Sequence, residues 1–406
     1  MSRSKMIPVL LAAVVVLVAG CSGIPKKDKN GDKNAATAQW RAARATVMVT
    51  LARDQFIQGN FDAARSSVTE AVKLLPDNPE IRTLSGRIAF EQGNLELAEA
   101  EFRFAQTSDP TFAAADYYLG VIMQRWQRLP AALDLYASAS QKAPKEVAYV
   151  LAQAETLVAL DRESDALNLL QASQKTFENS SEVRAAMGHV LVRQRRHAEA
   201  VDMLRQAVML APDDEGLRET LAKSLYSAAK YPEALENIER LLRSEKFKNR
   251  ADLHTLAGEC QLALGRPMDA RASFETASTL QPANVNFTLN LAKAALEVND
   301  TRRAEIAVRR ALALAPTHPQ ANLLMGYVRM EQNKLPEALA AFRRASDADA
   351  RDPMPICMAG VVLEKLGRRD EALRQYALAL TIKPDDELAK RLMNQLEASA
   401  AIGGDR

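Results

Sequence analysis

Cysteine is scarce in this chain of 406 residues, which contains only three. No two of them form a Cys-x-x-Cys pair, so the sequence offers neither a disulfide framework nor a cysteine-based zinc module. Aromatic residues are also few, at 5% of the chain, although hydrophobic residues as a class reach 48%. Alanine and leucine therefore supply most of the apolar surface, a bias that suits closely stacked helices.

An excess of charge of one sign is missing as well. The chain has 53 Lys and Arg against 51 Asp and Glu, and both members of the surplus, Arg3 and Lys5, lie in residues 1–21. A balanced chain exerts no general attraction on nucleic acid or on an anionic membrane surface. Nucleic acid is therefore not among the partners that we expect.

Recognisable catalytic motifs are the third absence. The four histidines, His189, His197, His254 and His318, form neither an HExxH motif nor a pair four residues apart. No GxSxG, Walker loop or GxGxxG occurs either. We expect no catalysis by this chain alone, no cofactor, no metal and no small-molecule substrate.

The amino terminus carries an apolar run that is too short to span a bilayer. A basic start, residues 1–5 (MSRSK), precedes fourteen apolar residues, 6–19 (MIPVLLAAVVVLVA), and a spanning helix needs about 20. This order is typical of a secretory signal peptide, with Ala19 and Gly20 marking the cleavage region. The third cysteine, Cys21, follows directly.

Val18-Ala19-Gly20-Cys21 resembles the lipobox of bacterial lipoproteins. The resemblance implies that the peptide is cut before Cys21, and that this residue is acylated and anchors the mature protein to a lipid bilayer. Ser22 then favours the outer membrane, facing the periplasm, in a Gram-negative host. The alternative is an ordinary signal peptide with an incidental cysteine. Residues 22–39 are polar and predict a flexible tether, so that residues 22–44 comprise the tether and the start of the first helix.

The rest of the chain repeats itself with a period of 34 residues, apart from one step of 36. An alanine recurs ten times, at positions 64, 98, 132, 166, 200, 234, 270, 304, 338 and 372. A large apolar residue follows four places later each time: Val68, Phe102, Tyr136, Leu170, Leu204, Ile238, Phe274, Val308, Phe342 and Tyr376. Glycine or alanine recurs earlier in each unit, where two helices are expected to cross closely.

This pattern resembles the tetratricopeptide repeat, a helix–turn–helix unit of 34 residues. The resemblance implies an all-α, right-handed superhelical solenoid of about ten repeats. Units 1–6 occupy residues 45–250 and units 7–10 occupy residues 251–386, each unit beginning at 45, 79, 113, 147, 181, 215, 251, 285, 319 or 353. Residues 387–406 comprise an amphipathic capping helix, over 387–399, and a disordered tail.

Turn residues fit the same register. A left-handed helix stop is expected between the helices of six units, at Gly59, Gly93, Gly265, Asn299, Asn333 and Gly367. Proline is expected to end the second helix of seven units, at Pro76, Pro110, Pro144, Pro212, Pro282, Pro316 and Pro384. Residues 243–250 (RSEKFKNR) contain the two extra residues, and form either a longer turn, which we favour, or a hinge between the two groups of units.

The two remaining cysteines, Cys260 and Cys357, fall three units apart in this register. Stacked helices place them about 25–30 Å apart, far beyond the ~7 Å between Cα atoms that a disulfide permits. We expect two buried thiols that act as small apolar side chains.

Tetratricopeptide arrays bind extended peptides or partner helices on the face lined by their first helices. Carried over by repeat position, the resemblance implies a peptide-binding groove lined by Arg53, Phe56, Arg87, Phe90, Tyr117, Arg125, His189, Arg193, Lys223, Tyr226 and Tyr327. Arginine and tyrosine are frequent interface anchors. The later units contribute more acidic residues, including Glu259, Glu297 and Glu331. The alternative is that these are solvated helix faces, with Phe56 and Phe90 partly packed between neighbours.

The sequence thus predicts an exported, lipid-anchored, non-catalytic scaffold that binds other envelope proteins. In this combination of features the chain resembles the pilotin-like lipoproteins that assist the assembly of pili and secretion complexes. The alternatives are a periplasmic scaffold for exopolysaccharide export or for cell-wall enzymes. No residue identifies the partner.

Overall fold

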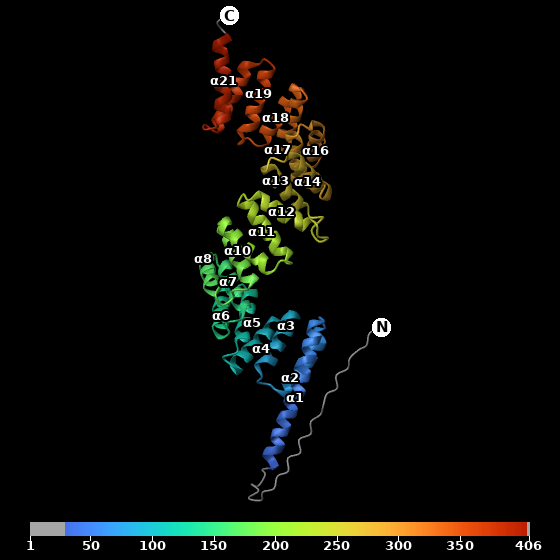
Figure 1. The fold of residues 1–406 in the computed structure, drawn as a ribbon, viewed down its shortest axis with the longest axis vertical. Helices are drawn as coiled ribbons and strands as arrows, with labels where there is room; N and C mark the ends of the chain where they lie inside the picture. Colours follow the sequence, from blue (N-terminus) through green and yellow to red (C-terminus); the bar gives the residue numbers. More distant parts are fainter. Residues whose placement is uncertain (1–28, 404–406) are drawn as a thin grey trace, which may run out of the picture. The chain divides into compact units, whose positions relative to one another are not determined.

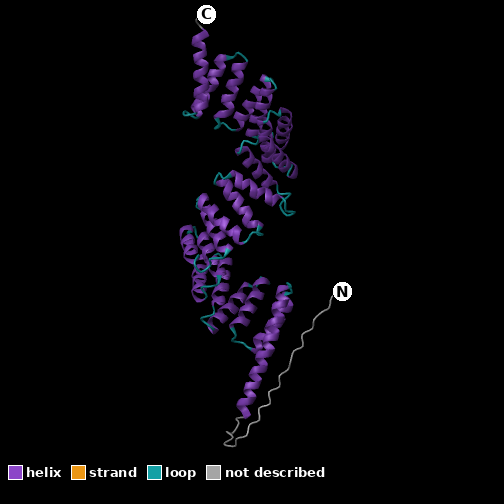
Figure 2. Cartoon of the chain, in the orientation of Figure 1, coloured by secondary structure: helices purple, strands orange, loops and turns teal. Residues whose placement is uncertain are grey.

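The computed structural model describes residues 29–403, which form 21 helices and no strand (Figure 1; Figure 2). Cys21 and the signal sequence lie outside the described residues. The chain divides into two compact units, residues 1–144 and 145–406. The division of the repeats expected at residue 250 does not coincide with this boundary.

The first compact unit contains six helices: α1 (Lys29–Ile57), α2 (Phe61–Leu74), α3 (Pro79–Glu91), α4 (Leu95–Ser108), α5 (Ala113–Arg125) and α6 (Leu129–Lys142). The second begins with α7 (Val147–Ala159), α8 (Glu163–Ser173), α9 (Ser181–Arg193), α10 (His197–Leu210), α11 (Glu215–Ser227), α12 (Tyr231–Leu242), α13 (Ala251–Ala263) and α14 (Pro267–Leu280). It continues with α15 (Val285–Glu297), α16 (Thr301–Leu314), α17 (Pro319–Glu331), α18 (Leu335–Ala348), α19 (Pro353–Lys365), α20 (Arg369–Ile382) and α21 (Glu387–Gly403). Every odd-numbered helix from α3 to α19 begins at the first residue of a repeat, and the all-α repeat fold is confirmed.

Each repeat has a core in which first and second helices cross. All ten recurring alanines of the second helices are fully buried, and so are the ten large apolar residues that follow them. Five of those large residues are aromatic, and each ring lies directly against a glycine of the first helix. A Cβ added at Gly86 would come within 2.5 Å of the Phe102 ring, and one at Gly258 within 2.6 Å of the Phe274 ring.

The four units without that glycine have alanine in its place and an aliphatic residue on the second helix. At the same register these pairs are Ala52 and Val68, Ala154 and Leu170, Ala222 and Ile238, and Ala292 and Val308. In nine of the ten units a glycine faces a ring or an alanine faces an aliphatic side chain, so the summed side-chain volume at the crossing is nearly constant. Close packing of protein interiors requires that match. The fifth unit is the exception, because Gly188 faces the aliphatic Leu204.

The turn within each repeat has one residue in the left-handed region. The six Gly and Asn stops expected from the sequence all have positive φ, from 56° to 78°. Four further residues at the equivalent position, Gln127, Asp161, Arg195 and Ala229, have φ between 56° and 59° without being glycine or asparagine. Tertiary packing therefore imposes this conformation where the local sequence disfavours it.

The second helices of the seven proline-containing repeats end just before their prolines, as predicted. In all seven proline-containing units the helix ends two residues before the proline, as α2 ends at Leu74 before Pro76. The residue before a proline avoids the helical region, and proline itself has no N–H to continue the ladder.

The expectation of coil over residues 22–39 is corrected from Lys29 onward, because α1 begins there. Alanine is the strongest helix former, and residues 35–45 contain six of them. Figure 2 shows the amino-terminal part of α1 extending past the end of α2. At the other end, α21 also continues to Gly403, beyond the expected limit at 399, with Leu396 buried against α18–α20 residues.

Residues 243–250 form a packed turn between α12 and α13. The ring of Phe247 is 2% exposed and belongs to one apolar cluster with Leu241 and Leu253, on either side of the turn. The core is thus continuous across the position where a hinge was the alternative expectation.

Both described cysteines are buried free thiols, as expected. They lie in separate apolar clusters, Cys260 with Leu253 and Cys357 with Ile356. Burial is the main cause that raises the pKa of each thiol to about 11. At neutral pH both are therefore protonated.

Candidate functional site

The residues predicted to line a groove all lie on first helices. Five are exposed: Arg53 on α1, Arg125 on α5, His189 and Arg193 on α9, and Lys223 on α11. The other six are half-buried: Phe56, Arg87, Phe90, Tyr117, Tyr226 and Tyr327. Each compact unit therefore presents its own part of the predicted surface.

The first compact unit has a cavity of about 300 Å³ among α1, α3 and α5. Arg53 and Arg87 line it, together with Glu80, Thr83, Leu84, Phe112, Ala114 and Tyr118. The Arg87 guanidinium lies over two rings, 5.1 Å from the Phe56 centroid and 5.4 Å from that of Tyr118. Cation–π attraction to both rings favours this position of the cation.

The charges of this cavity are mostly uncompensated. Arg53 reaches Glu80 at 3.7 Å, a long contact between two exposed side chains that contributes little energy. Two guanidinium groups thus line the cavity with one carboxylate. The arrangement suits an acidic or polar group of a bound chain more than a basic one.

The second compact unit has a cavity of about 350 Å³ among α7, α8 and α9. Its wall is apolar, formed by Ala154, Val158, Leu170, Ala186 and Val190, and its charged side chains are Glu155, His189 and Arg193. Arg193 also donates to Glu163, at 2.9 Å, and that hydrogen bond lowers the pKa of the Glu163 carboxyl. An apolar pocket with a few polar groups at its edge is the usual form of a side-chain or ligand site.

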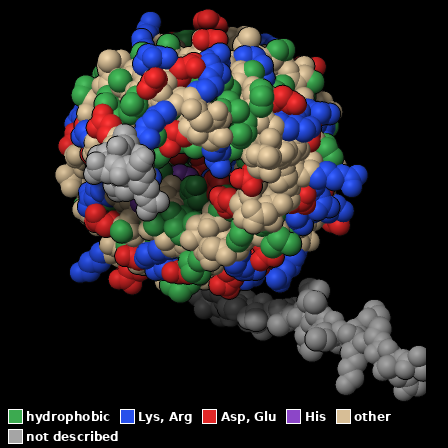
Figure 3. Space-filling model, turned by 90° about the horizontal axis from the view of Figure 1, so that it is seen from above, with side chains coloured by type: hydrophobic (Ala, Val, Ile, Leu, Met, Phe, Trp, Pro, Cys, Tyr) green, Lys and Arg blue, Asp and Glu red, His purple; other side chains and the backbone are tan. Residues whose placement is uncertain are grey.

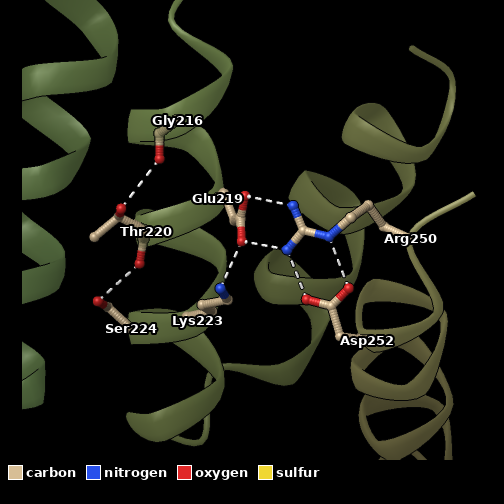
Figure 4. Close-up of polar contacts among 7 residues, drawn as sticks. All are labelled: Gly216, Glu219, Thr220, Lys223, Ser224, Arg250 and Asp252. Carbon is tan, nitrogen blue, oxygen red and sulfur yellow. Dashed lines mark hydrogen bonds and ion pairs between the residues drawn. The ribbon is translucent and has the colours of Figure 1, made fainter. Parts of the chain in front are cut away.

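Lys223 belongs to a charged network on α11 and α13 (Figure 4). Its Nζ lies 2.5 Å from the Glu219 carboxylate, which also accepts from Arg250 at 2.9 Å, and Arg250 donates to Asp252 at 2.6 Å. Burial raises the pKa of Glu219, but hydrogen bonds from Lys223 and Arg250 outweigh it, and the pKa lies below its usual value. Arg250 likewise lowers the pKa of Asp252. Two cations and two carboxylates neutralise one another, so Lys223 is engaged in the fold.

The predicted tyrosines are partly used in packing. Tyr327 meets Phe342 edge-to-face, with centroids 5.4 Å apart, and Tyr117 contacts Tyr118 at 5.1 Å. Burial, and then hydrogen bonding to Glu259, raise the pKa of Tyr226 to about 12. These rings present part of their surface to solvent on the first-helix face.

The repeat positions missed two features that the structure reveals. Tyr118 is at position 6 of its unit, next to the predicted Tyr117, and lines the first cavity. Position 6 is alanine at both 152 and 186. The other eight units have a larger residue there: Thr50, Leu84, Tyr118, Thr220, Leu256, Asn290, Leu324 and Met358. Of the two alanines, Ala186 lines the second cavity, and its small side chain is the sequence signal for that cavity.

Charge is mixed over the visible surface. Lys and Arg side chains lie among Asp and Glu side chains across the face seen in Figure 3. Among residues 29–403 no group of three or more His, Cys, Asp or Glu side chains could hold a metal ion. In the same part of the chain, no helix has the length and apolar character that crossing a membrane requires.

Comparison with known proteins identifies the class. Profiles of the tetratricopeptide repeat family match residues 49–111, 181–214, 219–285, 289–353 and 356–386, more than half of the chain. The chain belongs to the tetratricopeptide repeat family, whose arrays bind peptides or partner proteins.

Individual relatives are more distant. The chain is 25% identical to Cellulose synthase operon protein C of Pseudomonas fluorescens (strain SBW25) over 77% of this chain and 28% of that protein. It is 23% identical to human (Homo sapiens) DnaJ homolog subfamily C member 7 over 52% of this chain and 45% of that one. The crystal structure of a tetratricopeptide repeat protein from Parabacteroides merdae ATCC 43184 is 18% identical, covering 63% of this chain and 99% of its own, with a TM-score of 0.43. The chain thus spans less than half the length of either curated relative.

Proposed function

We propose that this protein is a non-catalytic scaffold that binds an extended peptide or a partner helix along its first-helix face. The apolar cavity on α7–α9 carries the proposal. Its volume, about 350 Å³, is at the lower end of the range for binding pockets and suits one large side chain of a bound segment. His189 and Arg193, at its edge, are exposed and positioned to orient that segment.

The charge reversal Arg193→Glu tests this site. We expect it to lower recovery of co-purified partners at least tenfold, because it removes a donor at the cavity and places a carboxylate beside Glu155 and Glu163. Affinity purification from the native cell, quantified by mass spectrometry, is the measurement. Arg205→Glu, on the second helix α10, is the matched control, since Arg205 is also ion-paired and its side chain is partly accessible. Equal losses with both variants would contradict the proposal.

We also propose that acylation of Cys21 anchors the scaffold to a membrane, the outer membrane facing the periplasm in a Gram-negative host. The support is the ordered succession of basic start, apolar run and Val18-Ala19-Gly20-Cys21. Cys21→Ser should abolish anchoring, so the protein either enters the soluble fraction or remains uncleaved. Fractionation with mass measurement of the mature amino terminus decides this, and Ser22→Ala is the control. Mature, membrane-bound Cys21→Ser protein would contradict the anchor.

The scaffold's pathway is a separate proposal. Assisting the assembly of a pilus or secretion complex is the first candidate, from the resemblance to pilotin-like lipoproteins. Exopolysaccharide export is the second, supported by the similarity to Cellulose synthase operon protein C. A scaffold for cell-wall enzymes would bind a different client in the same way. The partners captured from the cell distinguish these pathways.

A further inference from the structure

The outer edge of α1 has exposed apolar residues at positions that are covered in every later repeat. Val47 and Leu51 are at positions 3 and 7 of the first repeat, and they are 61% and 42% exposed. In the nine later repeats no residue at either position is exposed. Position 3 is occupied there by Ile81, Ala115, Tyr149, Val183, Leu217, Leu253, Phe287, Ala321 and Pro355, and position 7 by Ser85, Leu119, Gln153, Met187, Leu221, Ala257, Leu291, Met325 and Ala359.

What covers these positions elsewhere is the second helix of the preceding repeat. Leu253 and Ala257 of α13 share one apolar cluster with Ile238 and Leu241 of α12. Ala321 and Met325 of α17 share another with Val308 and Ala311 of α16. The edge of α1 is therefore shaped to receive a helix, but α1 is the first described helix, and within residues 29–403 no second helix of a preceding repeat lies on it.

The apolar edge extends beyond the repeat itself. Trp40 is 55% exposed and lies seven residues, about two turns, before Val47 on the same side of the helix. Trp40, Val47 and Leu51 form a stripe roughly 16 Å long. Arg53 and Phe56, of the proposed binding face, lie on a different side of α1. The carboxyl-terminal end of the array differs, because α21 covers it with Leu388, Leu392 and Leu396.

The charges around this stripe indicate what covers it. Residues 33–57 contain four basic side chains, Lys33, Arg41, Arg44 and Arg53, and one acidic, Asp54. The Arg44 guanidinium lies over the Trp40 ring, 5.3 Å from its centroid, on the stripe itself. A second copy of α1 would bring like charges together, whereas a helix flanked by carboxylates would neutralise them.

We propose that an acidic amphipathic helix of another protein packs on the stripe Trp40–Val47–Leu51, in the place that a preceding repeat's second helix occupies in the rest of the array. This site is separate from the first-helix face and does not depend on the proposed function. Helix binding by an apolar stripe with flanking charges is a general recognition mode.

A helix from this chain supplies the probe. The sequence of α12, YPEALENIERLL, has three glutamates and one arginine, and α12 already packs on positions 3 and 7 of α13. A fluorescent peptide of residues 231–242, cross-linked on its polar side to remain helical, is titrated into the full chain and followed by anisotropy. We expect binding that weakens at least tenfold in Val47→Asp/Leu51→Asp, and at least threefold when the three glutamates of the peptide are replaced by glutamine.

Ile57→Asp is the matched control, because Ile57 is 81% exposed on α1 but lies off the stripe, and it should bind the peptide like the wild type. Arg193→Glu should also leave peptide binding unchanged, which separates this site from the proposed groove. Binding unaffected by Val47→Asp/Leu51→Asp would overturn the proposal. Three other results would also overturn it. The first is a wild-type dimer that dissociates in Val47→Asp/Leu51→Asp, and the second is stripe-dependent binding to phosphatidylglycerol vesicles with no binding to the peptide. The third is peptide binding only after residues 1–28 are deleted, which would make those residues the occupant of the stripe.

Discussion

Gly258→Ala should destabilise the second compact unit by about 2 kcal/mol. In an ordinary helix interior the same change is favourable by about 1 kcal/mol, because alanine is the better helix former. Here the new Cβ would lie 2.6 Å from the Phe274 ring, and overpacking of a core typically costs about 1–3 kcal/mol or more. The ring is fully buried, so it has no room to turn aside. Urea unfolding followed by circular dichroism measures the change.

The double variant Gly258→Ala/Phe274→Val should recover most of the loss. It reproduces the pair found naturally at Ala52 and Val68, and again at Ala292 and Val308. Phe274→Val alone should be destabilising through the cavity it leaves. We therefore expect the double variant to lose less free energy of unfolding than the sum of the losses in the two single variants. Additive effects, or a stabilising Gly258→Ala, would contradict the size matching between helices.

Phe247→Ala should have the largest effect, a loss of about 3–5 kcal/mol, the usual cost of removing a buried ring. Phe247 is 2% exposed and joins α12 to α13 through one apolar cluster. Amide hydrogen exchange should show faster opening on both sides of residues 243–250, because their shared core is lost.

Lys246→Ala is the control for this experiment. Lys246 is exposed and contacts the same ring from outside, with Nζ 4.9 Å from its centroid, so its removal should change stability by less than about 0.5 kcal/mol. If Phe247→Ala lowers stability no more than Lys246→Ala does, the description of residues 243–250 as a packed turn is wrong and the hinge interpretation holds.

The period of the sequence was sufficient to predict the repeats. The recurring alanine and the large residue four places later lie where the two helices of each unit cross. Because every unit needs this crossing, these residues are sufficient to assign the boundaries of the repeats. Left-handed stops were predictable at Gly and Asn but not at Gln127, Asp161, Arg195 and Ala229, where tertiary packing overrides local preference. The start of α1 was missed because its polar residues were weighed above its alanines.

Repeat numbering predicts which helix carries each candidate side chain, but not which neighbours that side chain contacts. Repeat numbering placed Arg53, Arg87, His189 and Arg193 on cavities. It did not indicate that Lys223 is neutralised by Glu219, nor that Tyr327 packs on Phe342. Such pairings depend on neighbouring units, and a position-by-position rule contains no information about them. The small side chain of Ala186 lines the cavity on α7–α9, and no list of functional residue types would include an alanine.

The most direct test of the account is photo-crosslinking in the native cell from a reactive amino acid placed at Arg53 or at His189, one on each cavity. Met209, exposed on the second helix α10, is the control position. We predict that both cavity positions capture the same partner proteins and that position 209 does not. Capture from position 209, with none from the two cavities, would show that the first-helix face is not the binding surface.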